Sequence, residues 1–112
     1  TPNKAGKLSI CNEPTKPKDY FNKIIIIDFD YRLTLSIPHG LDGLKLWDAG
    51  IILSRYVIIN CNIFKDKEVL ELGTGVGISA ICVKKWTKCK SVTMTDYHPS
   101  VIENAKKNCV KN

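Results

Sequence analysis

The sequence lacks the features of several protein classes. Its five cysteines are odd in number and include no C-x-x-C pair, so we expect neither a zinc site nor a disulfide framework and favour a reducing compartment. No apolar run is long enough to span a bilayer, since the longest, residues 51–59, is broken by Ser54 and Arg55. A secretory signal pattern is also missing. We therefore expect a cytoplasmic protein with no metal and no membrane partner.

The hydrophobic fraction of these 112 residues, 44%, is ordinary for a folded domain, so the sequence lacks the composition of a disordered chain. This length allows one domain at most. The 17 basic and 11 acidic residues give a formal charge of +6, with lysines concentrated near both ends of the chain. Such lysines suit either a nucleic-acid surface or solvated helix ends and loops. Because no aromatic residues are interleaved with them, the sequence favours solvated lysines over a nucleic-acid partner.

The N-terminal third predicts an irregular arm followed by a hairpin. Residues 1–22 are rich in proline, lysine and asparagine and show little periodicity. The β-branched run 23–28 and the alternating run 31–37 predict two strands that turn near residues 28–30. The isoleucines of the first strand are prone to aggregate, so we expect them to be covered. The inner face of the second strand is predicted to be Tyr31, Leu33, Leu35 and Ile37.

The remaining two thirds alternate between helix and strand patterns. An amphipathic helix is predicted from Trp47 to about Asn60, with Trp47, Ile51, Val57 and Ile58 along its apolar stripe. A buried strand, 68–72, is followed by a helix from Ile78, a second strand, 91–95, and a final helix that begins at Pro99. The predicted inner face of that last helix is Val101, Ile102, Ala105 and Cys109, with Val110 at its margin. The fold class is therefore α/β, with half of a βαβ unit at its centre.

A glycine turn joins the strand 68–72 to the helix that follows. Gly73, Gly75 and Gly77 stand at alternate positions, so a ligand can lie close to the main chain and the turn can adopt positive φ. A dinucleotide fingerprint would require a third glycine at position 78, which is Ile78. An acid, Glu71, precedes the first glycine by two residues. The simpler interpretation is a glycine turn that serves only tight packing.

Asp96 ends the second strand, about twenty residues beyond the glycine turn. In a parallel βαβ unit its carboxylate lies beside the crevice and can accept hydrogen bonds from two ribose hydroxyls. The alternative is a turn-forming aspartate that satisfies nearby backbone N–H groups. Two residues later, His98 suits acid–base chemistry or a helix start beside Pro99, and its position favours the helix start.

Three segments together resemble a known family. Residues 43–50 resemble its G-x-x-x-W-[DE]-A signature, residues 69–77 resemble V-L-E-L-G-x-G-x-G, and residues 95–101 resemble T/S-D-x-H-P-x-V. The family is the family 16 protein-lysine methyltransferases, which are class I, seven-β-strand, S-adenosylmethionine-dependent enzymes. Within it, the His-Pro element and the last helix are most similar to the elongation factor 2 lysine methyltransferases. The resemblance covers about residues 43–112.

This resemblance implies a Rossmann-like half-fold with an N-terminal β-hairpin and helix and an incomplete sheet. Residues 23–112 would form the cofactor-binding part of a methyltransferase domain. It also implies that Glu71 binds the methionine ammonium of the cofactor, directly or through water. An aromatic wall at Trp47 would attract the sulfonium, although a tryptophan here also suits a core anchor. The implied cofactor-binding residues are Trp47, Glu71, Gly73, Thr74, Gly75 and Asp96.

The resemblance further implies that an acceptor-site motif, which positions the target lysine, lies outside these 112 residues. We therefore expect an N-terminal fragment with no catalytic residue of its own and with a protein substrate, such as elongation factor 2. The edge of the strand at residues 69–72 should be paired by the refolded hairpin, by another chain or by swapping. Two other functions remain open: a methyltransferase for RNA or a small molecule, and a binding module that is not an enzyme.

Overall fold

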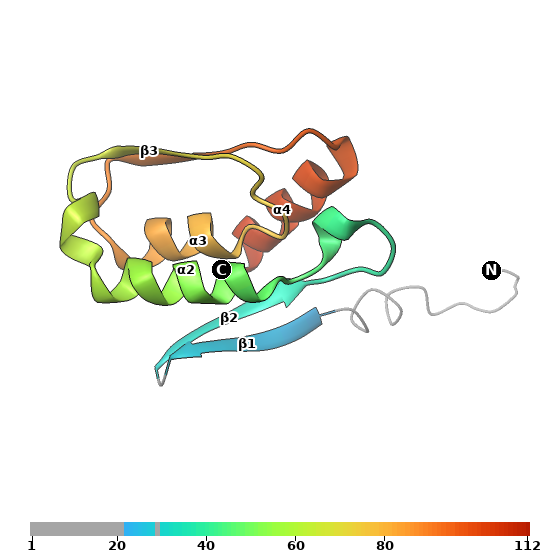
Figure 1. Ribbon diagram of the computed structural model, residues 1–112, viewed down its shortest axis with the longest axis horizontal. Coiled ribbons are helices and arrows are strands. Elements are labelled where there is room, and N and C mark those ends of the chain that lie inside the picture. Colours follow the sequence, from blue (N-terminus) through green and yellow to red (C-terminus); the bar gives the residue numbers. More distant parts are fainter. Residues whose placement is uncertain (1–21, 29) are drawn as a thin grey trace, which may run out of the picture.

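The computed structural model describes residues 22–28 and 30–112, which form two small sheets and three α-helices (Figure 1). β1 (Asn22–Asp28) and β2 (Tyr31–Ser36) pair antiparallel, and β3 (Glu68–Glu71) and β4 (Ser91–Met94) pair parallel. The predicted hairpin is confirmed, since the strands pair up to Asp28 and Tyr31. The irregular arm expected over residues 1–22 lies outside the described residues, except for Asn22, which begins β1.

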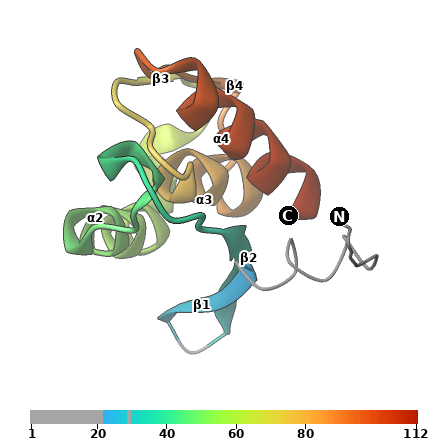
Figure 2. The ribbon, with the colours of Figure 1, turned by 90° about the vertical axis from the view of Figure 1, so that its right-hand side faces the viewer.

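The helices are α2 (Asp48–Ile59), α3 (Ile78–Trp86) and α4 (Pro99–Lys111). Two short 3-10 turns, η1 (Asp42–Leu44) and η2 (Cys61–Phe64), precede and follow α2. Figure 1 shows α2 and α3 beside one another beneath β3 and β4, with the hairpin on the far side of these helices. In the turned view, α4 lies beside α3 and reaches down toward β2 (Figure 2). The molecule is therefore α/β, as predicted.

β3, α3 and β4 form the expected βαβ unit. The two strands are in register from the pair Glu68 and Ser91 to the pair Glu71 and Met94. Pairing continues beyond β4, because Thr95 N–H donates to the Glu71 carbonyl at 3.0 Å. Since parallel strands end at the same edge of a sheet, the glycine turn and the segment after β4 lie side by side. This arrangement is consistent with a partial Rossmann-like methyltransferase fold.

The core lies where α2, α3 and the hairpin meet. The first six residues of α3, 78–83, are all buried, because the helix has neighbours on several sides. Tyr31 of β2 packs edge-on against Trp86 at the end of α3, with 5.0 Å between ring centroids. Leu33 and Leu35 are buried and Tyr31 and Ile37 are partly buried, so the predicted inner face of β2 is confirmed. The fully buried residues of this core include Ile27, Leu35 and Cys82.

The isoleucine run is covered on only one face. Ile27 is buried and Ile25 packs against the core, whereas Ile24 and Ile26 are 70% and 59% exposed. Alternation along a strand places neighbouring side chains on opposite faces, and only one face of this two-stranded sheet has helices against it. α2 is also bound to β1 through Arg55, whose Nε donates to the Ile27 carbonyl at 2.8 Å. The expectation that the whole run is covered is therefore wrong for half of its residues.

The inner face of α4 differs from the prediction. Val101 and Ala105 are buried, but Cys109 is exposed and Val110 is 88% exposed. Asn104 and Asn108 take the inward positions further along the helix. The physical reason is the surface that α4 faces: its second half lies against the backbone edge of β2, where amide side chains can form hydrogen bonds and apolar side chains cannot.

The free edge of β3 is not paired by the hairpin. β1 and β2 form a separate sheet, and among residues 22–28 and 30–112 the only strand paired with β3 is β4. Leu70 and Leu72 are 62% and 78% exposed at this edge. The first of the three expected ways of pairing the edge is therefore wrong. The hairpin is held instead by α2 and α4, through Arg55 and the asparagines of α4.

Candidate functional site

Glu71, the last residue of β3, is held beside the start of α3. Thr74 Oγ1 donates to its Oε1 at 2.6 Å, and a backbone hydrogen bond from Ala80 reaches the same carboxylate. Burial raises the pKa of Glu71 above its ordinary value of 4.5, because desolvation disfavours the charge more than these two hydrogen bonds favour it. The carboxylate is thus a partly desolvated acceptor at the N-terminal end of a helix.

The glycine turn has the backbone conformation that its sequence predicts. Gly73, Gly75 and Gly77 have φ angles of +68°, +57° and +93°, which other residues adopt only with strain. Gly77 N–H donates to the Thr74 carbonyl at 2.9 Å and closes a four-residue turn. A Cβ at Gly73 would meet no atom within 4 Å, so this part of the main chain borders open space. A ligand can therefore approach the backbone here.

Asp96 joins the glycine turn to the segment after β4. Its Oδ2 accepts a hydrogen bond from Gly75 N–H at 3.1 Å, and its Oδ1 accepts one from Tyr97 N–H at 2.9 Å. The neighbouring backbones are joined as well, since Thr74 N–H donates to the Thr95 carbonyl at 2.8 Å. The carboxylate thus satisfies local backbone N–H groups, as in the alternative interpretation. It also lies next to the glycine turn, and a carboxylate with an unused lone pair can accept from a hydroxyl.

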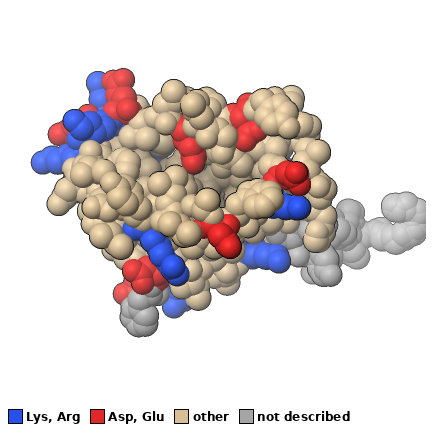
Figure 3. Space-filling view, in the orientation of Figure 1, with Lys and Arg blue, Asp and Glu red and all other residues tan. Residues whose placement is uncertain are grey.

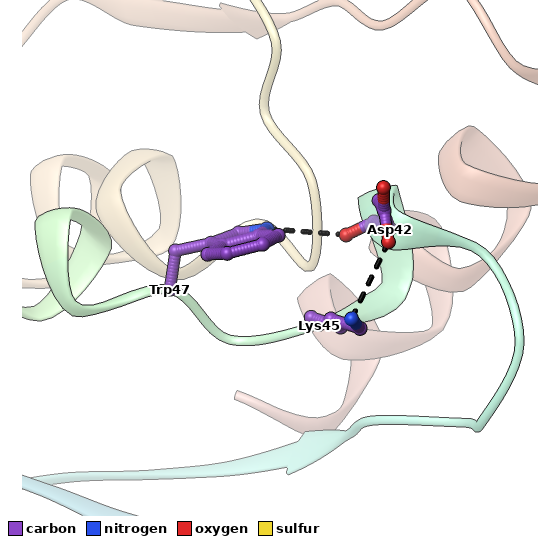
Figure 4. Close-up of polar contacts among 3 residues, drawn as sticks. All are labelled: Asp42, Lys45 and Trp47. Atoms are coloured by element: carbon purple, nitrogen blue, oxygen red, sulfur yellow. Dashed lines mark hydrogen bonds and ion pairs between the residues drawn. The ribbon is translucent and has the colours of Figure 1, made fainter.

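Trp47 lies immediately before α2 and its side chain is 56% exposed. Figure 4 shows the indole directed back toward η1, where Nε1 donates to the Asp42 carbonyl at 3.1 Å. Lys45 Nζ lies 5.5 Å from the indole centroid and 3.4 Å from Asp42 Oδ1. The interpretation of Trp47 as a core anchor is therefore wrong, since the ring forms part of the surface. Lys45 stands over one face of the ring, a neighbour that the sequence pattern did not predict.

A hollow of about 350 Å³ brings most of the predicted residues together. Its lining comes from the segment before α2, from the first half of α2 and from the turn between β3 and α3. Leu46, Leu53 and Ile78 supply apolar walls. The predicted residues in the lining are Trp47, Glu71, Gly73, Thr74 and Gly75. Asp96 is not part of the lining and is joined to it through Gly75 N–H.

The size of the hollow and the chemical groups around it suit S-adenosylmethionine as a ligand. The hollow falls within the 300–1,000 Å³ that is usual for small-molecule sites, and it combines apolar walls with a few polar groups. Glu71 offers a carboxylate for an ammonium group, and the open backbone at Gly73 leaves room for the rest of the ligand. Asp96 lies where the carboxyl ends of the two strands meet, which is where this class of sheet binds ligands.

Two polar residues near the site have structural roles. His98 precedes α4, and its Nδ1 accepts a hydrogen bond from Ser100 N–H at 3.1 Å, which confirms the helix-start interpretation. Cys82 is fully buried in α3, and burial raises its thiol pKa from 9.0 to about 11. The thiol is therefore protonated at neutral pH and is not a nucleophile.

Basic and acidic side chains lie close together on the surface of the molecule. On the face drawn in Figure 3, basic side chains gather at one end next to acidic ones, and Lys90 Nζ lies 3.1 Å from Glu68 Oε2. This mixed pattern favours the interpretation that the lysines are solvated.

None of the helices in the described part of the chain has both the length and the apolar character needed to cross a membrane.

Residues missed by the sequence analysis complete the site. Thr95 supplies the carbonyl that binds Thr74 N–H, and Asn108 donates to the Val76 carbonyl at 2.8 Å. Gly43 approaches the glycine turn from η1, with its carbonyl 3.5 Å from where a Cβ at Gly75 would lie. The spacing of Asn104, Asn108 and Asn112, one helical turn apart, was the signal that could have revealed the contribution of α4.

Comparison with known proteins agrees with the motif resemblance. Residues 38–112 match the family described as lysine methyltransferase. The human protein-lysine N-methyltransferase EEF2KMT is 33% identical over 79 residues, which are 70% of this chain and 24% of that protein. Protein-lysine N-methyltransferase EFM3 from Chaetomium thermophilum is 36% identical over 73 residues, 65% of this chain and 22% of that protein.

A third relative covers more of the chain. The protein N-terminal and lysine N-methyltransferase efm7 of Schizosaccharomyces pombe is 34% identical over 96 residues, which are 82% of this chain and 37% of that protein. The chain thus spans about a quarter of the length of the first two relatives. With the family match extending from residue 38 to the last residue, over the glycine turn, Trp47 and Asp96, the chain belongs to the lysine methyltransferase family.

Proposed function

We propose that this chain is the cofactor-binding part of a protein-lysine N-methyltransferase that uses S-adenosylmethionine. The observation that carries the proposal is the hollow of about 350 Å³, in which Trp47, Glu71 and the glycine turn meet beside Asp96. When bound, S-adenosylmethionine supplies an electrophilic methyl group. The names of the three relatives described above, each a protein N-methyltransferase, support a protein amine as the acceptor.

Each predicted residue has a role in this proposal. The carboxylate of Glu71 binds the ammonium of the methionine moiety, while the backbone of Gly73, Thr74 and Gly75 lies against the cofactor. The carboxylate of Asp96 accepts from the ribose hydroxyls while it keeps its bond to Gly75 N–H. The indole of Trp47 forms the wall opposite the glycine turn. Charge-assisted hydrogen bonds of this kind contribute about 1.5–3 kcal/mol each.

The substrate, location and assembly belong to the same proposal. The name of the human relative supports elongation factor 2 as the protein substrate, and such a substrate places the enzyme in the cytoplasm. The residues that position the acceptor lysine belong to a part of the enzyme outside these 112 residues, so this chain has no catalytic residue of its own. We also propose that the free edge of β3 pairs with a second chain, either directly or by swapping.

A methylation assay tests the proposal and separates it from the alternatives. Full-length protein would be incubated with radiolabelled S-adenosylmethionine and cell extract, with and without RNase. We expect label in a protein band whether or not RNase is added, and a mass shift on lysine in that protein. Label that disappears with RNase would identify an RNA acceptor instead. No transfer to any acceptor, together with no cofactor binding, would favour a binding module that is not an enzyme.

A further inference from the structure

The second half of α4 and its C-cap residue, Asn112, form hydrogen bonds with the outer edge of β2. Asn112 binds both backbone groups of Thr34: its Oδ1 accepts from the N–H at 3.0 Å and its Nδ2 donates to the carbonyl at 2.9 Å. Asn108 repeats this arrangement one turn earlier at Ser36, with distances of 2.6 and 3.1 Å. Asn104 adds a third amide, which donates to the Ser36 carbonyl at 2.9 Å. These amides satisfy backbone groups that a further strand would otherwise bind.

Asn108 differs from the other two asparagines in one contact. Its Nδ2 also donates to the Val76 carbonyl at 2.8 Å, inside the glycine turn. The side chain is fully buried, and its amide therefore bridges the hairpin and the turn without access to water. Within residues 22–28 and 30–112, the Asn112 side chain binds Thr34 and the Asn108 carbonyl, the Asn104 side chain binds Ser36, and neither binds the turn.

Two side chains that follow β4 in the sequence, Asp96 and Asn108, therefore bind two consecutive residues of the glycine turn. Asp96 accepts from Gly75 N–H, and Asn108 donates to the carbonyl of Val76, the next residue. Gly75 and Val76 are the two central residues of the turn that the hydrogen bond from Gly77 N–H to the Thr74 carbonyl closes. A turn made of glycines has little conformational preference of its own, so external hydrogen bonds decide which shape it adopts.

We propose that Asn108 is a positioning residue for the cofactor site: its buried amide fixes the Val76 peptide and with it the shape of the glycine turn. This inference rests on the proposed function only in naming the ligand, because the position of the turn can be measured without one. It also assigns a role to the hairpin. Ser36 holds Asn108 from the opposite side, so this side chain links the hairpin to the turn.

The test compares Asn108→Ala with Asn112→Ala in the full-length protein. Both variants remove an amide that binds β2 from α4, and only the first removes a contact with the turn. Two quantities are measured: hydrogen–deuterium exchange of the peptide covering residues 71–77, without ligand, and the Kd for S-adenosylhomocysteine. We expect Asn108→Ala to accelerate exchange in this peptide and to weaken binding at least tenfold. For Asn112→Ala we expect faster exchange in β2, unchanged exchange in the turn and a Kd within about twofold of the wild type.

A third variant keeps the test decisive if Asn108→Ala does not fold. Asn108→Ser leaves a hydroxyl that can satisfy one freed backbone group but cannot span Ser36 and Val76 together, so we expect the same changes at smaller amplitude. Equal effects of the Asn108 and Asn112 variants on the turn and on the Kd would overturn the proposal and leave the proposed function intact. If the wild type bound no S-adenosylhomocysteine while exchange in the turn still responded only to Asn108, the cofactor assignment would fail and the positioning role would stand.

Discussion

The glycine at position 43 is required by the side chain that it faces. A Cβ built at Gly43 would lie 2.6 Å from Cγ2 of Val101, the first buried residue of α4. Valine is stiff at χ1 and cannot rotate away freely. We expect Gly43→Ala to lower the free energy of unfolding by about 1–3 kcal/mol, the usual cost of overpacking, in a urea denaturation experiment.

A double-mutant cycle checks the cause of this loss. Val101→Ala removes the clashing methyl groups, so the double variant Gly43→Ala/Val101→Ala should lose less stability than the sum of the two single variants. Additive losses would show that the contact between η1 and α4 is not what excludes a side chain at position 43.

Glu71 should give the protein a pH dependence of defined sign. Its pKa is raised in the folded protein by burial, so between 4.5 and the folded pKa the folded state binds a proton more readily than the unfolded chain. Stability contributed by this residue is therefore largest below pH 4.5 and falls as pH rises through that window. Thermal unfolding at a series of pH values should show this slope in the wild type and a flatter one in Glu71→Gln. Glu103→Gln, at an exposed position of α4, is the control and should keep the wild-type slope.

Cofactor binding should depend on pH in the opposite direction. An ammonium group favours the ionised form of Glu71, so affinity for S-adenosylhomocysteine should rise across the window in which Glu71 loses its proton. Titrations on either side of the window, with Glu71→Gln beside the wild type, measure this effect. An affinity that rises equally in both proteins would assign the pH dependence to another group.

The free edge of β3 is the element that most needs a partner. Leu53, Tyr56, Val69 and Leu70 line a hollow of about 330 Å³ beside this edge, and Leu70 and Leu72 are largely exposed. A strand edge with apolar neighbours recruits further strands. We expect the 112-residue chain to self-associate, and we expect Leu70→Lys to reduce that association because charge at an edge opposes pairing. Sedimentation velocity measures both.

Val110→Lys is the matched control for this experiment, because Val110 is also an exposed apolar residue but lies on the outer side of α4. It should leave the association unchanged. A wild-type chain that remains monomeric while folded would contradict the proposed pairing of β3.

Elements that bury apolar side chains could be predicted from the sequence, whereas a helix face that buries polar side chains could not. The strands and helices from 68 to 111 follow apolar periodicity and turn residues, and the structure has them within a residue or two of the predicted limits. The inner face of α4 could not be predicted in the same way. Burial of Asn104 and Asn108 depends on the edge of β2, which is about seventy residues away in the sequence. Hydrophobicity alone therefore selected Cys109 and Val110 instead.

At the scale of the whole molecule, the site also combines residues that local sequence pattern could place with residues that depend on distant contacts. Glu71, the glycine turn and Asp96 are brought together by one βαβ unit, so local pattern and strand order were enough to predict their proximity. Trp47 comes from a separate segment, and its exposure and its contact with Lys45 depend on how η1 packs. The placement of the hairpin in a sheet of its own likewise depends on long-range hydrogen bonds from α2 and α4.

The central claim is that the glycine turn, Glu71, Trp47 and Asp96 bind one adenosyl ligand, and calorimetric titration of the full-length protein tests it most directly. The wild type should bind S-adenosylhomocysteine and not NAD. Asp96→Ala should weaken the binding tenfold or more, a loss of about 1.4 kcal/mol. Binding of NAD in preference, or an affinity for S-adenosylhomocysteine that is the same in the wild type and in Asp96→Ala, would contradict the claim.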